Sequence, residues 1–111
     1  MSTHLEQGDI IQVEFSPGIG HEPAKTRPAL VLSSFQFNTR CSLVSVAPIT
    51  STDNGYPLHV PVQCRNVKGF VAVEALRNLD VNQRGYEILG YADDTTMKKV
   101  LGIIRGMYDL R

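Results

Sequence analysis

The sequence contains no tryptophan and only two cysteines, Cys41 and Cys64. The cysteines lack C-x-x-C spacing and the three histidines fall at no regular ligand interval, whereas paired, closely spaced ligands usually mark a structural zinc site. A zinc site is therefore not expected. Both thiols are expected to be ordinary buried or half-buried side chains.

An excess of charge of one sign is also missing, because 11 Lys and Arg residues balance 11 Asp and Glu residues. A net charge of zero argues against a protein that coats nucleic acid by bulk attraction, but it leaves open an enzyme that binds a few phosphates in a local groove. No apolar run approaches the roughly 20 residues that span a bilayer. The polar, acidic residues 1–8 do not resemble a secretory signal. With 111 residues and 42% apolar content, the chain is expected to be a single cytoplasmic domain over residues 1–111 with no membrane association.

Apolar runs of two kinds predict a series of short strands. Alternation predicts a half-buried strand over residues 9–15, and a continuous apolar run predicts a buried strand over 29–34. Further strands are expected at 42–49, 56–63 and 70–76, with loops at 16–28 and 50–55 and a turn over FQFNTR. Pro57 and Pro61 place the 56–63 strand at a sheet edge, because proline cannot donate to a ladder.

The last segment has helical rather than strand periodicity. Asp93 or Asp94 can cap a helix, and apolar residues then recur at three- and four-residue steps. These residues are Met97, Val100, Leu101, Ile104 and Tyr108. Gly102 and Gly106 either weaken this helix or allow it to pack closely on the sheet. Many short strands followed by one helix predict an α+β, mainly β fold: an antiparallel barrel or curled sheet with a helix across it.

Three groups of polar residues could carry chemistry. They are His21, Glu22, Lys25, Thr26 and Arg27 in the first loop, the Thr50-Ser51-Thr52 run, and Glu74 with Arg77. Metal-free RNA cleavage needs a base for the ribose 2′-hydroxyl, a cation for the phosphorane and an acid for the departing 5′-oxygen. Arginine suits the second role because its planar fork binds two phosphate oxygens, and histidine or a carboxylate suits the others.

Each of these residues also has an ordinary structural interpretation. Arg27 before Pro28 could be a surface arginine at a strand entrance, and His21 could simply be solvated. Thr50 and Ser51 could make turn hydrogen bonds only.

Glu74 is a lone acid in an apolar segment, so it either faces solvent or is held by a partner. Alternation does not decide between these. His59 is interpreted as an edge-strand residue without a catalytic role.

Three ordered motifs resemble the MazF/PemK family of bacterial toxins. GDIIQVEFSPGIGHEPAKTRPALVLS, residues 8–33, is similar to the family's opening, with its Gly-Asp, Gly-His-Glu and Thr-Arg-Pro. Phe37-Asn38 and VAPITST, residues 46–52, match the next segments, and GFVAVEALRNLD, residues 69–80, resembles the family's strand ending in an acid. The resemblance extends from Gly8 to about Tyr108 and weakens after Asp80.

The resemblance implies an SH3-like barrel with helices, as in the MazF/PemK and CcdB group, and a homodimer. It implies sequence-specific cleavage of single-stranded mRNA, without ribosome, metal or cofactor, leaving a 2′,3′-cyclic phosphate and a 5′-hydroxyl. It further implies a cognate antitoxin that blocks the RNA groove, with DNA reached only through the antitoxin complex.

The resemblance also implies residue roles. Arg27 would stabilise the phosphorane, Thr50 would contact the scissile phosphate, Glu74 matches the strand acid that some members use as base, and His21 matches a loop residue implicated in proton transfer. The residues expected to bind RNA are Glu22, Lys25, Ser51, Thr52 and Arg77.

The chain departs from the family at three positions. Ala72 stands where the PemK branch has an arginine, Ala75 stands where many members have Gln, and Pro23 stands where Gln is common. One alternative function is a CcdB-like gyrase inhibitor, which is expected to need a Trp-Gly-Ile type ending, whereas this chain ends Tyr-Asp-Leu-Arg. The other is a catalytically inactive relative that binds RNA or a partner.

Overall fold

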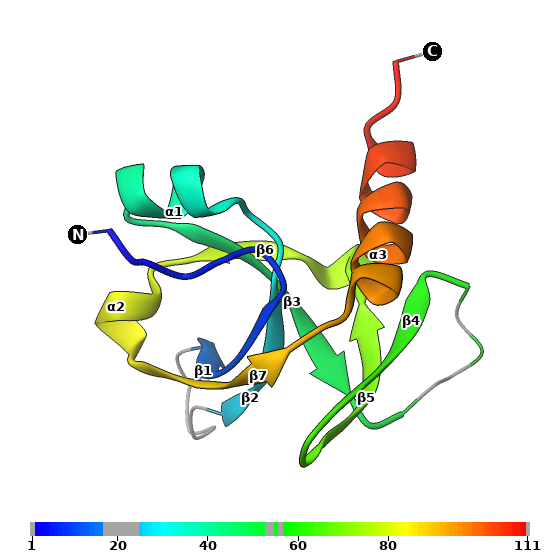
Figure 1. Ribbon diagram of the computed structural model, residues 1–111, viewed down its shortest axis with the longest axis horizontal. Coiled ribbons are helices and arrows are strands. Elements are labelled where there is room, and N and C mark those ends of the chain that lie inside the picture. Colours follow the sequence, from blue (N-terminus) through cyan, green and yellow to red (C-terminus); the bar gives the residue numbers. More distant parts are fainter. Residues whose placement is uncertain (1, 17–24, 53–54, 56, 111) are drawn as a thin grey trace.

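The computed structural model describes residues 2–16, 25–52, 55 and 57–110 (Figure 1). In chain order its elements are β1 (Asp9–Ser16), β2 (Lys25–Val31), α1 (Phe35–Arg40), β3 (Val44–Thr50), β4 (His59–Cys64), β5 (Val67–Ala72), the 3-10 turn η1 (Val73–Ala75), β6 (Arg77–Leu79), α2 (Val81–Arg84), β7 (Tyr86–Tyr91) and α3 (Asp94–Met107).

The strands form a curled antiparallel sheet in the order β4-β5-β3-β2-β1-β7, with β6 paired to β3 (Figure 1). This half-barrel with a C-terminal helix confirms the predicted mainly-β fold class. β4 lies at one edge of the strand order, as its prolines predicted, and Pro61 lies opposite Phe70 of β5.

Strand β3 is paired along both of its edges. Val46 to Pro48 pair with β2, while the other edge pairs first with β6, at Val44 to Val46, and then with β5, at Ile49 and Thr50. Val46 pairs with Arg77 and Ile49 pairs with Val71. The partner segment therefore covers six residue steps where β3 covers three, so it has three residues more than a regular ladder would need. The three residues of η1 take up this excess.

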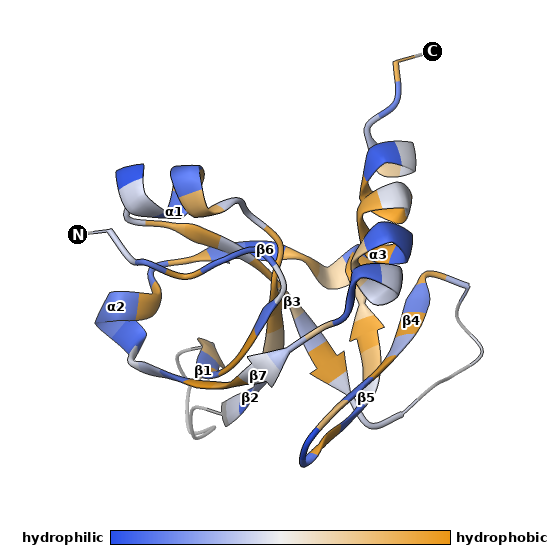
Figure 2. Ribbon diagram, in the orientation of Figure 1, coloured by the Kyte–Doolittle hydropathy of each residue, from blue (hydrophilic) through white to orange (hydrophobic). Residues whose placement is uncertain are grey.

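Two apolar clusters fill the interior, and residues of the sheet contribute to both. The first lies beneath α3 and contains Ile10, Leu30, Ile49, Val60, Val62, Val71, Met97 and Val100 among others. The second contains Leu5, Ile11, Val13, Phe15, Val31, Val46 and Val81 among others. β3 and β5 are mostly hydrophobic along their length (Figure 2), because residues of both strands are buried.

Strand β1 shows how this arrangement follows from the sequence. Ile11, Val13 and Phe15 all enter the second cluster, as the alternation predicted. Ile10 enters the first cluster, so both faces of the strand are covered at that end. Gln12 follows on the face of Ile10, since side chains alternate along a strand.

Helix α3 begins where its cap predicts. The Asp93 carboxylate accepts a hydrogen bond from the Thr96 amide at 2.8 Å, and this bond lowers the pKa of Asp93 below its usual value. Met97 and Val100 are buried in the first cluster. The idea that Gly102 and Gly106 allow close packing is wrong, because a Cβ at either position would meet no described atom within 4 Å.

The structure corrects several other predictions. FQFNTR forms helix α1 rather than a turn, because the Ser34 hydroxyl accepts from the Phe37 amide and caps it. β2 begins at Lys25 rather than at residue 29, because its ladder with β1 continues to that residue. The predicted strand over 70–76 is broken by η1.

Three elements near the C-terminal end were not predicted: β6, α2 and β7. α2 is a single turn capped by Asp80, which accepts from the Gln83 amide. In β7, Ile88 and Tyr91 are exposed, so no buried alternation marks this strand in the sequence.

Asn38 supplies a testable measure of local stability. Its side chain is fully buried and donates to the carbonyls of Leu5 and Ser33, and its oxygen accepts from the Ser33 hydroxyl. Asn38→Ala leaves these groups without partners, so we expect the free energy of unfolding to fall by about 2–3 kcal/mol.

Chemical denaturation measures this change. The control is Thr39→Ala on the same helix, whose hydroxyl donates only to the Gln36 carbonyl in an exposed setting, and its cost should stay below about 0.5 kcal/mol. Equal losses in the two variants would contradict a special role for Asn38.

Candidate active site

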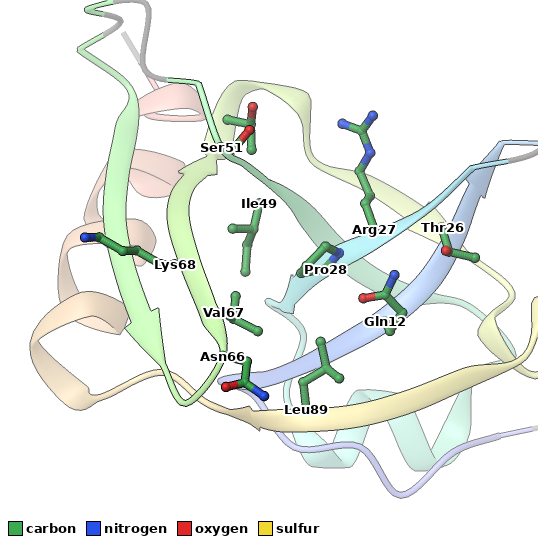
Figure 3. A pocket seen from close by; sticks show the side chains of 11 residues that line it. Gln12, Thr26, Arg27, Pro28, Ile49, Ser51, Asn66, Val67, Lys68 and Leu89 are labelled. Carbon is green, nitrogen blue, oxygen red and sulfur yellow. The ribbon is translucent and has the colours of Figure 1, made fainter.

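A pocket of about 650 Å³ opens between the β1-β2-β7 part of the sheet and the β4–β5 hairpin (Figure 3). It is lined by Gln12, Thr26, Arg27, Pro28, Ile49, Thr50, Ser51, Asn66, Val67, Lys68 and Leu89. The sequence predicted Arg27 in one loop and Thr50 with Ser51 in another, and the fold brings all three to this one pocket.

Arg27 lies on β2 opposite Val13 of β1 and is half-buried. The following Pro28 restricts it to extended backbone, which suits its place in the strand. Its guanidinium points toward the end of the pocket where Ser51 lies (Figure 3). In the described part of the chain no acid forms a salt bridge with it. Its donors are therefore available for an anion such as a phosphate.

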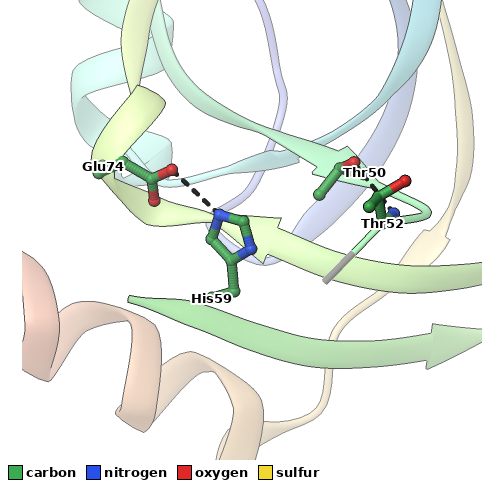
Figure 4. A network of polar contacts seen from close by, with 4 residues as sticks. All are labelled: Thr50, Thr52, His59 and Glu74. Carbon is green, nitrogen blue, oxygen red and sulfur yellow. Dashed lines mark hydrogen bonds and ion pairs between the residues drawn. The ribbon is translucent and has the colours of Figure 1, made fainter. Parts of the chain in front are cut away.

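Thr50 ends β3 and is half-buried, whereas Ser51 and Thr52 are exposed. The Thr52 amide donates to the Thr50 hydroxyl oxygen at 3.2 Å (Figure 4), which is the turn hydrogen bond that the ordinary interpretation expected. A hydroxyl that accepts from an amide still has its own proton to donate. The bond therefore orients the Thr50 hydroxyl and leaves it able to donate to a phosphate oxygen.

Gly69 fixes how closely β5 approaches Thr50. A Cβ at Gly69 would collide with the Thr50 carbonyl oxygen and press on the Ile49 side chain. Glycine is the residue that permits such a close approach between backbones. The close approach of β5 to Thr50 therefore explains why a glycine stands at the start of the GFVAVEAL segment.

The end of the pocket away from Ser51 has a different chemical character. Pro28, Ile49, Val67 and Leu89 give it apolar walls, and the side-chain amides of Gln12 and Asn66 lie there (Figure 3). Sequence reasoning missed both amides. Gln12 alternates with apolar residues along β1, as Glu14 does, and this pattern also fits an ordinary solvent-facing position.

Glu74 does not line this pocket; it lies on η1 and contacts β4. Its Oε2 is 3.0 Å from His59 Nε2 (Figure 4), and the exposed fractions of the two side chains are 30% and 6%. The interpretation that a partner holds Glu74 is therefore confirmed, and His59 is that partner.

The other predicted site residues are distributed more widely. The Arg77 guanidinium carbon lies 5.7 Å from the ring centroid of Phe15, beside the second cluster and away from the pocket lining. Thr52 follows the pocket residues but does not line the pocket. His21 and Glu22 fall outside the described residues, and Lys25 begins β2 without a described side chain.

Within residues 2–16, 25–52, 55 and 57–110, no three His, Cys, Asp or Glu side chains group as metal ligands. Cys41 and Cys64 are half-buried free thiols, as expected. Among the described helices, none has the length and apolar character needed to cross a membrane.

Comparison of the sequence with protein families matches residues 6–108 to the PemK-like, MazF-like toxin of type II toxin–antitoxin systems. The endoribonuclease toxin ChpB of Escherichia coli (strain K12) is 37% identical over 107 residues, covering 89% of this chain and 90% of ChpB. The endoribonuclease toxin MazF of the same strain is 32% identical over 80 residues, covering 72% of each chain.

Solved structures are similar over nearly the whole chain. A crystal structure of MazE–MazF (form II) from Deinococcus radiodurans matches with a TM-score of 0.85 and 32% identity, covering 96% of each chain. MazF (form I) from the same organism matches with a TM-score of 0.83. The motifs, the half-barrel and these comparisons agree: the chain belongs to the PemK-like, MazF-like toxin family of type II toxin–antitoxin systems.

Proposed function

We propose that this protein is a metal-independent endoribonuclease that cleaves single-stranded mRNA at a short specific sequence. The observation that carries the proposal is that Arg27 and Thr50 line one open pocket. A cation and an oriented donor are the groups that stabilise a phosphorane. The relatives ChpB and MazF, both endoribonuclease toxins, support the same activity.

In the proposed reaction, the ribose 2′-oxygen of the RNA attacks the adjacent phosphate of the same strand. A base takes the proton of the ribose 2′-hydroxyl, the 2′-oxygen forms a bond to phosphorus, and the bond from phosphorus to the 5′-oxygen breaks. Arg27 holds the charge on the phosphorane, and Thr50 with Ser51 donates to its oxygens. A proton passes to the departing 5′-oxygen, with Arg27 as the candidate donor, giving a 2′,3′-cyclic phosphate and a 5′-hydroxyl.

The base is to be found among His21, Glu22 and Glu74. Glu74 is the one of these three that falls within the described part of the chain, where its Oε2 contacts His59 outside the pocket lining. The residues of the first loop, together with Lys25, are proposed to bind the RNA backbone. Arg77 and Thr52 stay proposed RNA contacts at the periphery of the site.

We also propose that the toxin is a homodimer neutralised by a cognate antitoxin, and that it meets DNA only through that complex. The similar MazE–MazF structure of Deinococcus radiodurans supports an antitoxin partner. Exposed apolar residues on β7, Ile88 and Tyr91, and at the end of α3, Met107 and Tyr108, provide strand and helix surfaces of the kind that interfaces use.

The first prediction concerns Arg27. Incubation of the protein with a long RNA in excess EDTA should give discrete fragments that carry 2′,3′-cyclic phosphate ends. Arg27→Ala removes the cation that faces the phosphorane, so the cleavage rate should fall by about 10²–10³-fold.

Arg40→Ala is the matched control, because Arg40 is an exposed arginine at the end of α1 that does not line the pocket. It should keep the parent rate. Absence of cleavage by the parent across several RNAs would overturn the endonuclease proposal and make gyrase inhibition or inactive RNA binding the next functions to test.

The second prediction concerns Glu74. Because this carboxylate contacts His59 rather than lining the pocket, the pH–rate profile of Glu74→Gln should keep the shape of the parent profile. Loss of the acidic limb in this variant would instead identify Glu74 as the general base. Thermal unfolding of both proteins separates an effect on the rate from loss of the His59 contact.

The third prediction concerns assembly. Light scattering at micromolar concentration should give twice the 12.3 kDa mass of the chain. A dilution series serves as the control, since a dimer dissociates on dilution and an aggregate of mixed size does not behave in this way. A single 12.3 kDa species at micromolar concentration would contradict the dimer.

A further inference from the structure

We propose that the end of the pocket away from Ser51 is a nucleobase slot, in which Gln12 and Asn66 recognise the hydrogen-bonding edge of one base beside the cleaved phosphate. The inference rests on the proposed function, since it assigns part of the same pocket to substrate specificity. Gln12, Pro28, Ile49, Asn66, Val67 and Leu89 line the slot.

The walls of the slot suit the faces of a planar ring. Gln12 and Pro28 belong to β1 and β2, and Leu89 belongs to the neighbouring β7. Ile49 and Val67 come from β3 and β5, with Asn66 directly before β5 (Figure 3). The slot therefore lies between two parts of the half-barrel, next to the first apolar cluster, which includes Ile49 and Val67. Apolar side chains on both sides favour an unstacked base, which single-stranded RNA presents and a duplex does not.

Contacts at the tip of the hairpin hold Asn66 near β7. The Tyr91 amide of β7 donates to the Cys64 sulfur at 3.4 Å, and a Cβ at Gly90 would collide with that sulfur. Cys64 ends β4, two residues before Asn66. The hairpin thus closes on β7 beside Leu89, and the far end of the slot has a fixed wall.

The two amides supply what the edge of a base requires. Each side-chain amide carries both hydrogen-bond donors and an acceptor. The edge of each base also presents donors and acceptors, so the two can pair. Gln12 is half-buried and Asn66 is exposed, and neither side-chain amide has a hydrogen-bond partner among the residues that the structure describes. A half-buried amide without a partner binds a complementary group at little cost, because it exchanges water for a fixed partner.

The slot is adjacent to the phosphate end of the pocket. Pro28 directly follows Arg27 on β2, and Ile49 directly precedes Thr50 on β3. Consecutive Cα atoms are about 3.8 Å apart. On each of the two strands, a residue of the slot is therefore the direct neighbour of a residue proposed to contact the phosphate. A base in the slot therefore belongs to a nucleotide that flanks the cleaved bond.

Recognition in the slot depends on hydrogen bonds rather than on charge. Among the described residues of the pocket lining, Arg27 and Lys68 are the charged ones, and the Lys68 ammonium points away from Gln12 and Asn66 (Figure 3). Changes at the two amides should therefore alter base preference and leave the salt dependence of RNA binding unchanged, because salt dependence counts phosphate contacts.

The experiment maps cleavage sites in an RNA pool of random sequence for the parent, Gln12→Met and Asn66→Leu. Both substitutions keep the approximate shape of the side chain and remove its hydrogen bonds. We expect each variant to lose roughly tenfold of the discrimination at one nucleotide position next to the cut, and the position should be the same in both. Preferences at the other positions should be retained.

Gln63→Met is the matched control, because Gln63 is an exposed amide on β4 outside this pocket. It should retain the parent preference at every position. Variants at Gln12 and Asn66 that both keep the parent preference, while still folded by thermal unfolding, would overturn the slot and leave the endonuclease proposal standing.

A binding measurement separates the two proposals. Short 2′-deoxy oligonucleotides cannot be cleaved by this route, because they lack the attacking hydroxyl, and their affinities are measured with the base varied at each position. If the parent cuts no RNA but shows a base preference that Gln12→Met abolishes, the slot stands and the endonuclease proposal fails. If binding shows no base preference and no RNA is cut, both fail.

Discussion

The pairing of β3 with different strands along its length is the constraint on which the rest of the structure depends. Its edge opposite β2 pairs with β6 near Val44 and with β5 at Ile49 and Thr50. The three residues of η1 lie between those two partners. This division turns the β4–β5 hairpin away from the β1-β2-β7 strands and leaves a pocket between them, which Thr50 helps to line. Gly69 then sets how near β5 comes to the Thr50 carbonyl.

The sequence predicts those elements in which the apolar pattern corresponds to a single type of secondary structure. The strand at residues 9–15, the edge strand with Pro61 and the helix that begins after Asp93 or Asp94 were each predicted, and each exists, with Asp93 as the cap. Prediction failed where one apolar run contains two different types of secondary structure. The run from Phe70 to Leu76 contains strand and then a 3-10 turn, because the excess of residues over β3 is a property of pairing and not of hydrophobicity. β7 was missed because Ile88 and Tyr91 are exposed.

The candidate site was predictable only in the part that motifs mark. Arg27 and Thr50 were identified by resemblance, and the fold brings them to one pocket. Alternation could not show that Glu74 faces His59, since that contact joins residues separated by 15 positions across β4 and η1. Gln12 and Asn66 were not predicted, because an isolated amide in a strand or at a hairpin tip has no local pattern. Their significance depends on Leu89 and Pro28, which reach the same pocket from other strands.

Charge balance and the form of the pocket are connected. A strongly basic protein binds any RNA through its phosphates, so most of its affinity carries no sequence information. This chain has no net charge, and the described lining of its pocket places a half-buried arginine at one end and neutral amides with apolar walls at the other. The fraction of binding free energy that comes from base contacts is larger when phosphate contacts are few. The proposed sequence-specific cleavage therefore agrees better with this balance of charges than a broad basic surface would.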